Sequence, residues 1–127
     1  MKRSRGLTTV AWIRDRLRTE RLPSAVVSSA LPRSVLSGRL AGRVARSADG
    51  PWSCTSSPSV GKACGPTARV EISIDGCPAA KVRAVVAPLP RGFDLAIGRD
   101  VIGRSVKRIQ FSPSRLAMFV CRTRPPS

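Results

Sequence analysis

The stretch Arg91–Arg104 reads RGFDLAIGRDVIGR and contains a dense apolar run that ends at a glycine. A short apolar run such as Leu95–Ile97, set between turn signals, is typical of a strand that is buried on both faces. Gly98 follows this run and indicates either a close backbone approach or a positive φ. Asp100 is suited to cap a helical turn that begins at Val101. The stretch therefore predicts a strand, a glycine corner and a short helix.

The segments on either side of this stretch predict further strands. Residues 69–76, RVEISIDG, alternate apolar and polar side chains, which is the pattern of a strand with one buried face. Asp75 and Gly76 form a typical hairpin turn. Residues 81–87, KVRAVVA, then return as a second strand. Residues 105–121 predict two more strands around a Ser-Pro-Ser turn.

The first 22 residues are rich in arginine and carry a helical pattern. Val10, Ile13 and Leu17 recur at helical spacing, which favours an amphipathic helix of about three turns, with an N-terminal strand as the alternative. Abundant arginine leaves organellar targeting open, although the two acidic residues in this segment argue against it. The localisation is otherwise unknown, with the cytoplasm as the default.

The next part of the chain contains a short strand, a helix and a loop. Ala25–Val27 is a β-like run, and a helix is expected from Ser34, which is an acceptable N-cap. Residues 49–68 are dominated by Gly, Pro and Ser, which predicts a loop. Cys54 and Cys64 are either a disulfide in an oxidising compartment or free thiols.

Composition excludes several classes of chemistry. The 127 residues carry 23 Lys and Arg against 7 Asp and Glu, a formal charge of +16, with no histidine. Without histidine, Ser-His-Asp and Cys-His catalysis are excluded. The four cysteines have no paired spacing, so no metal site is expected. No apolar run approaches transmembrane length. Arginines spread without interleaved aromatics favour non-specific attraction to nucleic acid.

The glycine corner resembles a segment of a known family. Two apolar residues ending at Ile97, then Gly98, Arg99 and Asp100, look like the closing segment of the retropepsin-like aspartic proteases. In that family the segment follows an Asp-apolar-apolar lead-in, which Asp94 begins here. It packs beside the catalytic loop and continues into a short helix. A motif of this length is a hypothesis until its structural context is known.

A second segment supplies part of that context. Val26-Val27 is similar to the family's strand before the catalytic loop, and residues 33–37, RSVLS, are similar to the segment after it. Ser28, Ser29 and Ala30 then stand where the family has Asp-Thr/Ser-Gly. The catalytic aspartate is thus replaced, and only Ser29 has the family's residue type.

The resemblance implies a mostly β fold, a retropepsin-like closed β-barrel subunit with one or two short helices. It implies three parts: a basic amphipathic segment at 1–22, the retropepsin-like domain at 23–121, and a disordered tail at 122–127. The turn at Asp75 and Gly76 is then assigned to the flap hairpin. The family's barrel depends on two subunits, so a homodimer is expected, with no cofactor and no metal.

The replaced aspartate decides the expected function. Aspartic proteolysis needs two carboxylates that share a proton, and a serine hydroxyl cannot take that role. With no histidine or lysine beside it in the sequence, Ser28 is also not an activated nucleophile. We expect a degenerate, proteolytically inactive domain that retains peptide binding or dimerisation. The alternatives are an active aspartic endopeptidase of the retropepsin type and a basic nucleic-acid-binding module.

Overall fold

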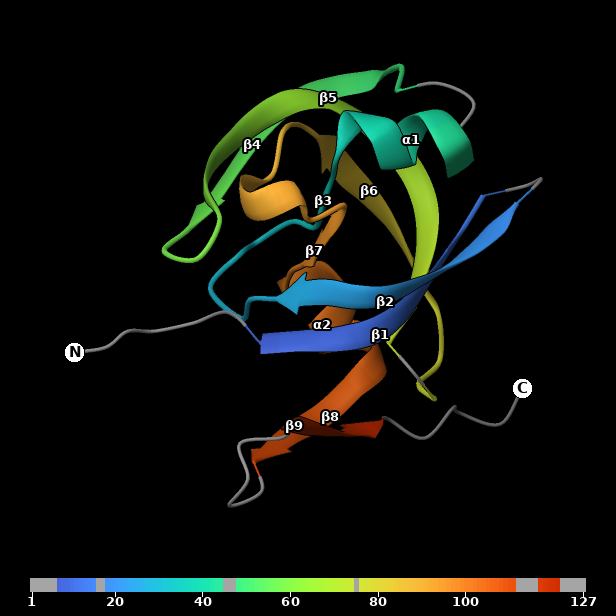
Figure 1. Cartoon of the computed structure of the whole chain (residues 1–127), viewed down its shortest axis with the longest axis vertical. Helices are drawn as coiled ribbons and strands as arrows, with labels where there is room; N and C mark the ends of the chain where they lie inside the picture. Colours follow the sequence, from blue (N-terminus) through green and yellow to red (C-terminus); the bar gives the residue numbers. More distant parts are fainter. Residues whose placement is uncertain (1–6, 16–17, 45–47, 75, 112–116, 122–127) are drawn as a thin grey trace.

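The computed structural model describes residues 7–15, 18–44, 48–74, 76–111 and 117–121 (Figure 1). In this part of the chain the protein is mostly β, with two short α-helices, as expected from the sequence. The proposed disordered tail at 122–127 lies outside the described residues.

The N-terminal segment forms strands, so the expectation of an amphipathic helix is wrong. β1 (Leu7–Arg14) and β2 (Thr19–Val27) are antiparallel neighbours, and β1 also pairs with β5 (Gly61–Ile74). Ala11 and Ile13 are fully buried while Trp12 between them is exposed, which is the alternation of a strand. Helical spacing was a weak signal here, because cross-strand pairing overrides local propensity. The strands in the described part of the basic segment therefore belong to the main sheet.

One seven-stranded sheet contains most of the strand residues that the structure describes. Its strand order is β1-β2-β7-β3-β6-β5-β4, and the additional β1–β5 pairing makes the sheet curl back on itself (Figure 1). The bounds of the strands not yet given are Val35–Leu36 for β3, Gly50–Ser57 for β4, Ala80–Val86 for β6 and Leu95–Ile97 for β7. The strands predicted at 69–76 and 81–87 are confirmed as parts of β5 and β6.

The region predicted as a loop at 49–68 is instead a hairpin. β4 and β5 pair in antiparallel register, with Cys54 directly opposite Cys64, and a disulfide joins the two. Gly61 adopts a φ of 79° at the start of β5, a conformation that glycine adopts without steric cost. The small and polar composition obscured the strand pattern, although Ala63 and Thr67 are buried on its inner face.

Three short helical segments connect the strands. These are α1 (Gly38–Val44), the 3-10 turn Pro90–Gly92, and α2 (Arg99–Ser105). The helix expected from Ser34 begins four residues later, because β3 comes first. Ser37 caps it, since its hydroxyl accepts the Leu40 N–H at 3.1 Å. The short helix after the glycine corner is confirmed, with Gly98 rather than Asp100 at the N-cap position.

The core lies on both faces of the central strands. Leu95 and Ile97 of β7 join the larger apolar cluster, while Ala96 between them joins a second cluster. All three are at most 1% exposed, which confirms a strand buried on both faces. Val35 and Leu36 of β3 divide between the two clusters in the same way. Fully burying each large aliphatic side chain stabilises the fold by about 1.5–3 kcal/mol.

The C-terminal strands form a separate pair. β8 (Val106–Phe111) and β9 (Ala117–Cys121) are antiparallel and lie to one side of the main sheet (Figure 1). These confirm the two strands expected between 105 and 121. A disulfide between Cys77 and Cys121 joins β9 to the segment before β6. This pairing connects the end of the described chain to the main sheet.

The two disulfides should stabilise the fold unequally. Replacing Cys77 and Cys121 together with alanine should lower the free energy of unfolding by about 4 kcal/mol, and replacing Cys54 and Cys64 by about 3 kcal/mol. The reason is that the first crosslink spans 44 residues and the second spans 10, so the first restricts the unfolded chain more. Urea denaturation of both double variants measures the difference. A larger loss from the Cys54 and Cys64 pair would contradict this expectation.

Candidate functional site

The loop that follows β2 is held against the end of β7 by backbone hydrogen bonds. The Ser28 N–H donates to the Ile97 carbonyl at 2.9 Å, and the Arg99 N–H donates to the Leu31 carbonyl at 2.7 Å. Within the loop, the Leu31 N–H donates to the Ser28 carbonyl at 3.1 Å. The parallel pairing of β2 with β7 places Val27 opposite Ile97, directly before these contacts. The serine pair and the glycine corner are therefore neighbours.

Glycine is required at position 98 because the backbone there lies close to the backbone of Leu31 and Arg33. Its φ of −105° and ψ of −171° are extended and accessible to any residue, so a positive φ is not the reason. A Cβ at this position would lie 2.5 Å from the Leu31 carbonyl oxygen and 3.0 Å from the Arg33 carbonyl carbon. Of the two explanations that the sequence allows, close approach is the one that holds.

Asp100 and Ser34 connect the two segments a second time. The Ser34 hydroxyl donates to the Asp100 carboxylate at 2.7 Å, and the Ser34 N–H donates to both carboxylate oxygens at 3.1 and 3.0 Å. The same hydroxyl accepts the Gly98 N–H at 3.0 Å. Asp100 also accepts its neighbour's N–H, that of Val101. Sequence reasoning missed Ser34 as a bridging residue, because a lone serine carries no signal of its distant partner.

The side chains of the loop itself carry no catalytic group. Ser28 is 7% exposed, whereas Ser29 and Ala30 are exposed. No hydrogen bond joins the Ser28 hydroxyl to another described residue, and the chain contains no histidine to act as its base. Ser28, Ser29 and Ala30 therefore supply no carboxylate, imidazole or amine that could activate water or a nucleophile.

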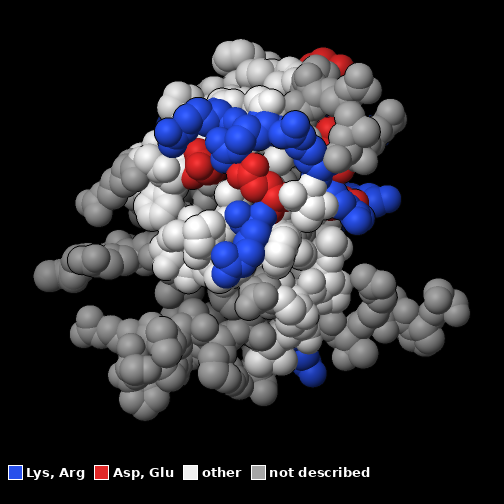
Figure 2. Space-filling view, turned by 45° about the vertical axis from the view of Figure 1, so that its right-hand side comes forward, with Lys and Arg blue, Asp and Glu red and all other residues white. Residues whose placement is uncertain are grey.

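Acidic side chains that could act elsewhere are engaged in structural contacts. Glu20 pairs with Arg43 at 2.7 Å, and Asp94 accepts the Ser37 hydroxyl at 2.7 Å. Arg43 also lies 3.6 Å from Asp94, so this group joins β2, α1 and the segment before β7. On the face that Figure 2 shows, acidic side chains lie directly against basic ones. Arg39 adds a further contact to Asp94 at 3.3 Å.

These contacts shift the pKa values of the group. The hydrogen bond from the Ser37 hydroxyl, with help from the two arginines, lowers the pKa of Asp94. The hydrogen bond from Arg43 lowers the pKa of Glu20, and the same bond raises the pKa of Arg43. Both carboxylates are therefore held ionised, which suits ion pairing and not general acid catalysis at neutral pH.

Of the two residues predicted to form the flap hairpin, Gly76 belongs to the turn between β5 and β6, and Asp75 lies outside the described residues. Their assignment to a flap stays a prediction. The hairpin that contacts the segment after the Ser28 loop is β4–β5, where the Thr55 hydroxyl accepts the Arg33 N–H at 3.2 Å. This hairpin lies in the segment that the sequence predicted as a loop.

Neither a metal site nor a free thiol is found in the described part of the chain. There, no three His, Cys, Asp or Glu side chains lie close enough to hold a metal ion. All four cysteines form disulfides. No helix among the described residues has the length and apolar character needed to cross a membrane. No protein-family model, curated protein or solved structure matches this chain.

Substitution of Gly98 should be costly. Gly98→Ala should destabilise the protein by about 2–3 kcal/mol, because the new methyl group would overlap the Leu31 carbonyl. The matched control is Gly42→Ala in α1, where nothing lies within 4 Å of the added Cβ. The control should be neutral or stabilising by about 0.5–1 kcal/mol, because alanine favours helix. Equal thermal midpoints for the two variants would show that the close approach is unimportant.

The Asp94 contacts should make stability depend on pH. The pKa of Asp94 in the folded protein lies below the ordinary value of about 3.9. The contribution of Asp94 to the free energy of unfolding is therefore fully present above that ordinary value, and it is lost as the pH falls through the pKa of the folded state. Asp94→Asn should therefore have a lower thermal midpoint than the wild type at pH 7. In acid the two proteins should have the same thermal midpoint. Asp49→Asn, at an exposed position, is the control. A constant difference between wild type and Asp94→Asn across pH 2–7 would refute the assignment.

Proposed function

We propose that this protein is a degenerate domain of the retropepsin-like aspartic protease type, which does not cleave peptides and acts by binding a peptide or by self-association. The observation that carries the proposal is the mutual backbone bonding of the Ser28 loop and the Gly98 corner. These are the two segments whose sequences resemble the family, and the residues that bond across them, Ser28 to Ile97 and Leu31 to Arg99, are 69 and 68 positions apart in the sequence.

The order of elements supports the same proposal. A hairpin leads into the loop, a short strand and a helix follow, a long hairpin comes next, and a buried strand ends at the corner before the last helix. In the pairing pattern, β7 lies between β2, which is parallel to it, and β3, which is antiparallel. The curled sheet agrees with a barrel-like subunit, and the closed barrel itself is part of the proposal.

The proposed loss of activity follows from the loop chemistry. Aspartic proteolysis at this position requires a carboxylate from each of two subunits. Ser28 supplies a hydroxyl instead, and no described carboxylate is hydrogen bonded to it. Ala30 is exposed, so its methyl group is accommodated without a clash with the core. The loop is therefore compatible with the fold and incompatible with that mechanism.

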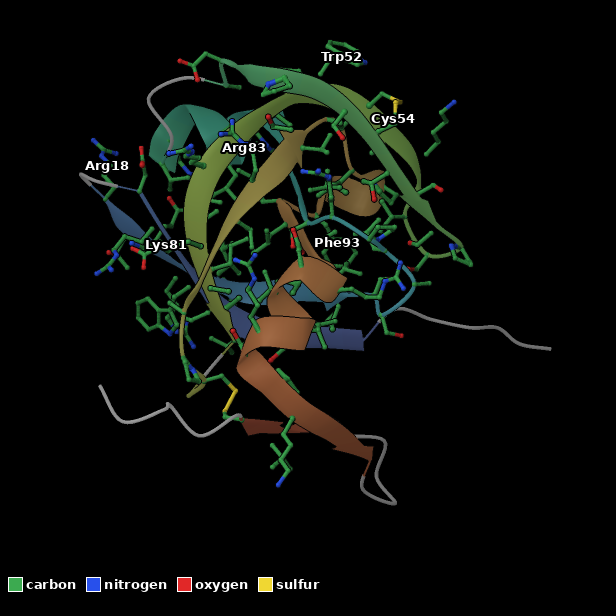
Figure 3. All side chains as sticks on the ribbon, turned by 180° about the vertical axis from the view of Figure 1, so that it is seen from behind. Arg18, Trp52, Cys54, Lys81, Arg83 and Phe93 are labelled. Carbon is green, nitrogen blue, oxygen red and sulfur yellow. A yellow bond between two sulfur atoms is a disulfide. The ribbon has the colours of Figure 1, made fainter. Side chains whose placement is uncertain are left out.

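Peptide binding is supported by the position of β4. β4 is an edge strand of the main sheet: among the described residues it pairs with β5 on one side, and no strand pairs with its other edge. An extended peptide can add to such an edge through main-chain hydrogen bonds. Trp52 lies on β4 and is 71% exposed, which makes it a natural contact and an intrinsic reporter (Figure 3).

The proposal predicts binding or association without turnover. Wild-type protein should leave a library of unstructured peptides uncleaved from pH 3 to pH 8, as checked by mass spectrometry. In a Trp12→Phe background, peptides that bind at β4 should shift the Trp52 emission to shorter wavelength, because the indole loses water. Sedimentation equilibrium measures self-association in the same samples. Cleavage that is lost in Ser28→Ala would overturn the proposal, as would a strictly monomeric protein that binds none of the peptides.

A further inference from the structure

A large basic groove lies on the outer side of β5 and β6. Its volume is about 1020 Å³, and basic side chains outnumber acidic ones in its lining two to one. The basic residues are Arg14, Arg33, Arg69, Lys81, Arg83 and Arg104. They come from β1, the segment after the Ser28 loop, both strands of the hairpin, and α2. The fold thus gathers on one surface cations that are scattered through the sequence.

Two of these arginines face each other without an acidic partner. Arg69 of β5 and Arg83 of β6 are directly opposite in the antiparallel register. Like charges at directly opposite positions destabilise a sheet. Neither side chain forms an ion pair with any described residue. No described carboxylate compensates this pair of charges, so a ligand anion is the natural compensation.

Two of the three acidic residues that line the groove, Glu71 and Asp100, are bonded to described partners. Glu71 is opposite Lys81 in the register but bonds Arg14 at 2.7 and 3.0 Å. Asp100 is committed to Ser34. Arg104 donates to the Lys81 carbonyl at 2.6 Å, which fixes a cation of α2 at the edge of the strand pair. Among the described residues of the groove, Arg69 of β5 and Lys81 and Arg83 of β6 form no ion pair, and Figure 3 labels the two cations of β6.

We propose that this groove binds the phosphate backbone of double-stranded nucleic acid without reading its sequence. Arginine presents a planar fork of donors that matches phosphate oxygens in a bidentate manner. Among the described residues that line the groove none is aromatic, so it offers no platform for stacking unpaired bases. A backbone with closely spaced charges suits several cations along one surface, and the formal charge of +16 attracts such a polyanion over distance.

The salt dependence of binding to a labelled duplex tests this proposal. Fluorescence anisotropy measures the affinity of the full chain for a 20-base-pair DNA at several salt concentrations. The variant Arg69→Gln/Arg83→Gln should reduce the slope of log affinity against log salt by about two, since each phosphate contact contributes about one. Two duplexes of unrelated sequence should give the same affinity. Removal of the like-charge pair should leave the thermal midpoint unchanged or raised, which checks that the variant is folded.

A charge-matched variant shows whether the groove is the site. Arg21→Gln/Lys62→Gln removes the same charge from exposed positions outside the groove. Its slope should remain close to that of the wild type, because screening limits distant charges. If the slope of log affinity against log salt falls equally in the two double variants, the effect is a general attraction between charges and the proposal is overturned. Binding of poly-glutamate, or of phosphatidylserine vesicles, that depends on the Arg69 and Arg83 pair while DNA binding does not would also overturn it.

Discussion

The structure depends on the close contact between the Ser28 loop and the Gly98 corner. Buried N–H and C=O groups are costly unless they are paired, and at this point two turns of chain satisfy each other. The contact needs a residue without a side chain at position 98. It also needs the Asp100 carboxylate, which accepts the Ser34 hydroxyl and the Ser34 N–H, the latter shared between its two oxygens. β7 has only three residues; β2 and β3 pair with its backbone on either side, and the two apolar clusters cover its two faces.

The surplus of positive charge is distributed unevenly over this scaffold. Around Asp94, two arginines and a glutamate form a compact network that joins three elements and holds both carboxylates ionised. Exposed ion pairs of this kind contribute little individually, and their geometry serves mainly to position α1. On the β5–β6 side, Arg69 and Arg83 have no such partner. The two surfaces therefore differ: around Asp94 the arginines are paired with carboxylates, whereas Arg69 and Arg83 form no ion pair with a described residue.

Sequence patterns predicted the parts of the fold where alternation or an apolar run is strong. β5, β6 and the strand, corner and helix around Gly98 belong to this class. The hairpin of β1 and β2 was not predicted, because the apolar residues of the N-terminal segment fit both a helical and a strand period. β4 was not predicted, because its small and polar residues do not show the alternation of a strand. The site was predicted only as a neighbourhood. Its bridging residues, Ser34 and Thr55, depend on contacts between distant segments that no local pattern contains.

The constraints at the Ser28 loop and the Gly98 corner act on the backbone. Gly98 and Asp100 are fixed by backbone geometry, since each contacts main-chain atoms of the opposite segment. Ser28 meets its structural requirement through its N–H and C=O groups alone, while Ser29 and Ala30 face solvent. The backbone contacts that hold the loop are therefore independent of which side chain stands at position 28. The fold of the loop and the chemistry of the side chain at position 28 are therefore separable: a substitution there changes the chemical group and leaves the backbone contacts in place.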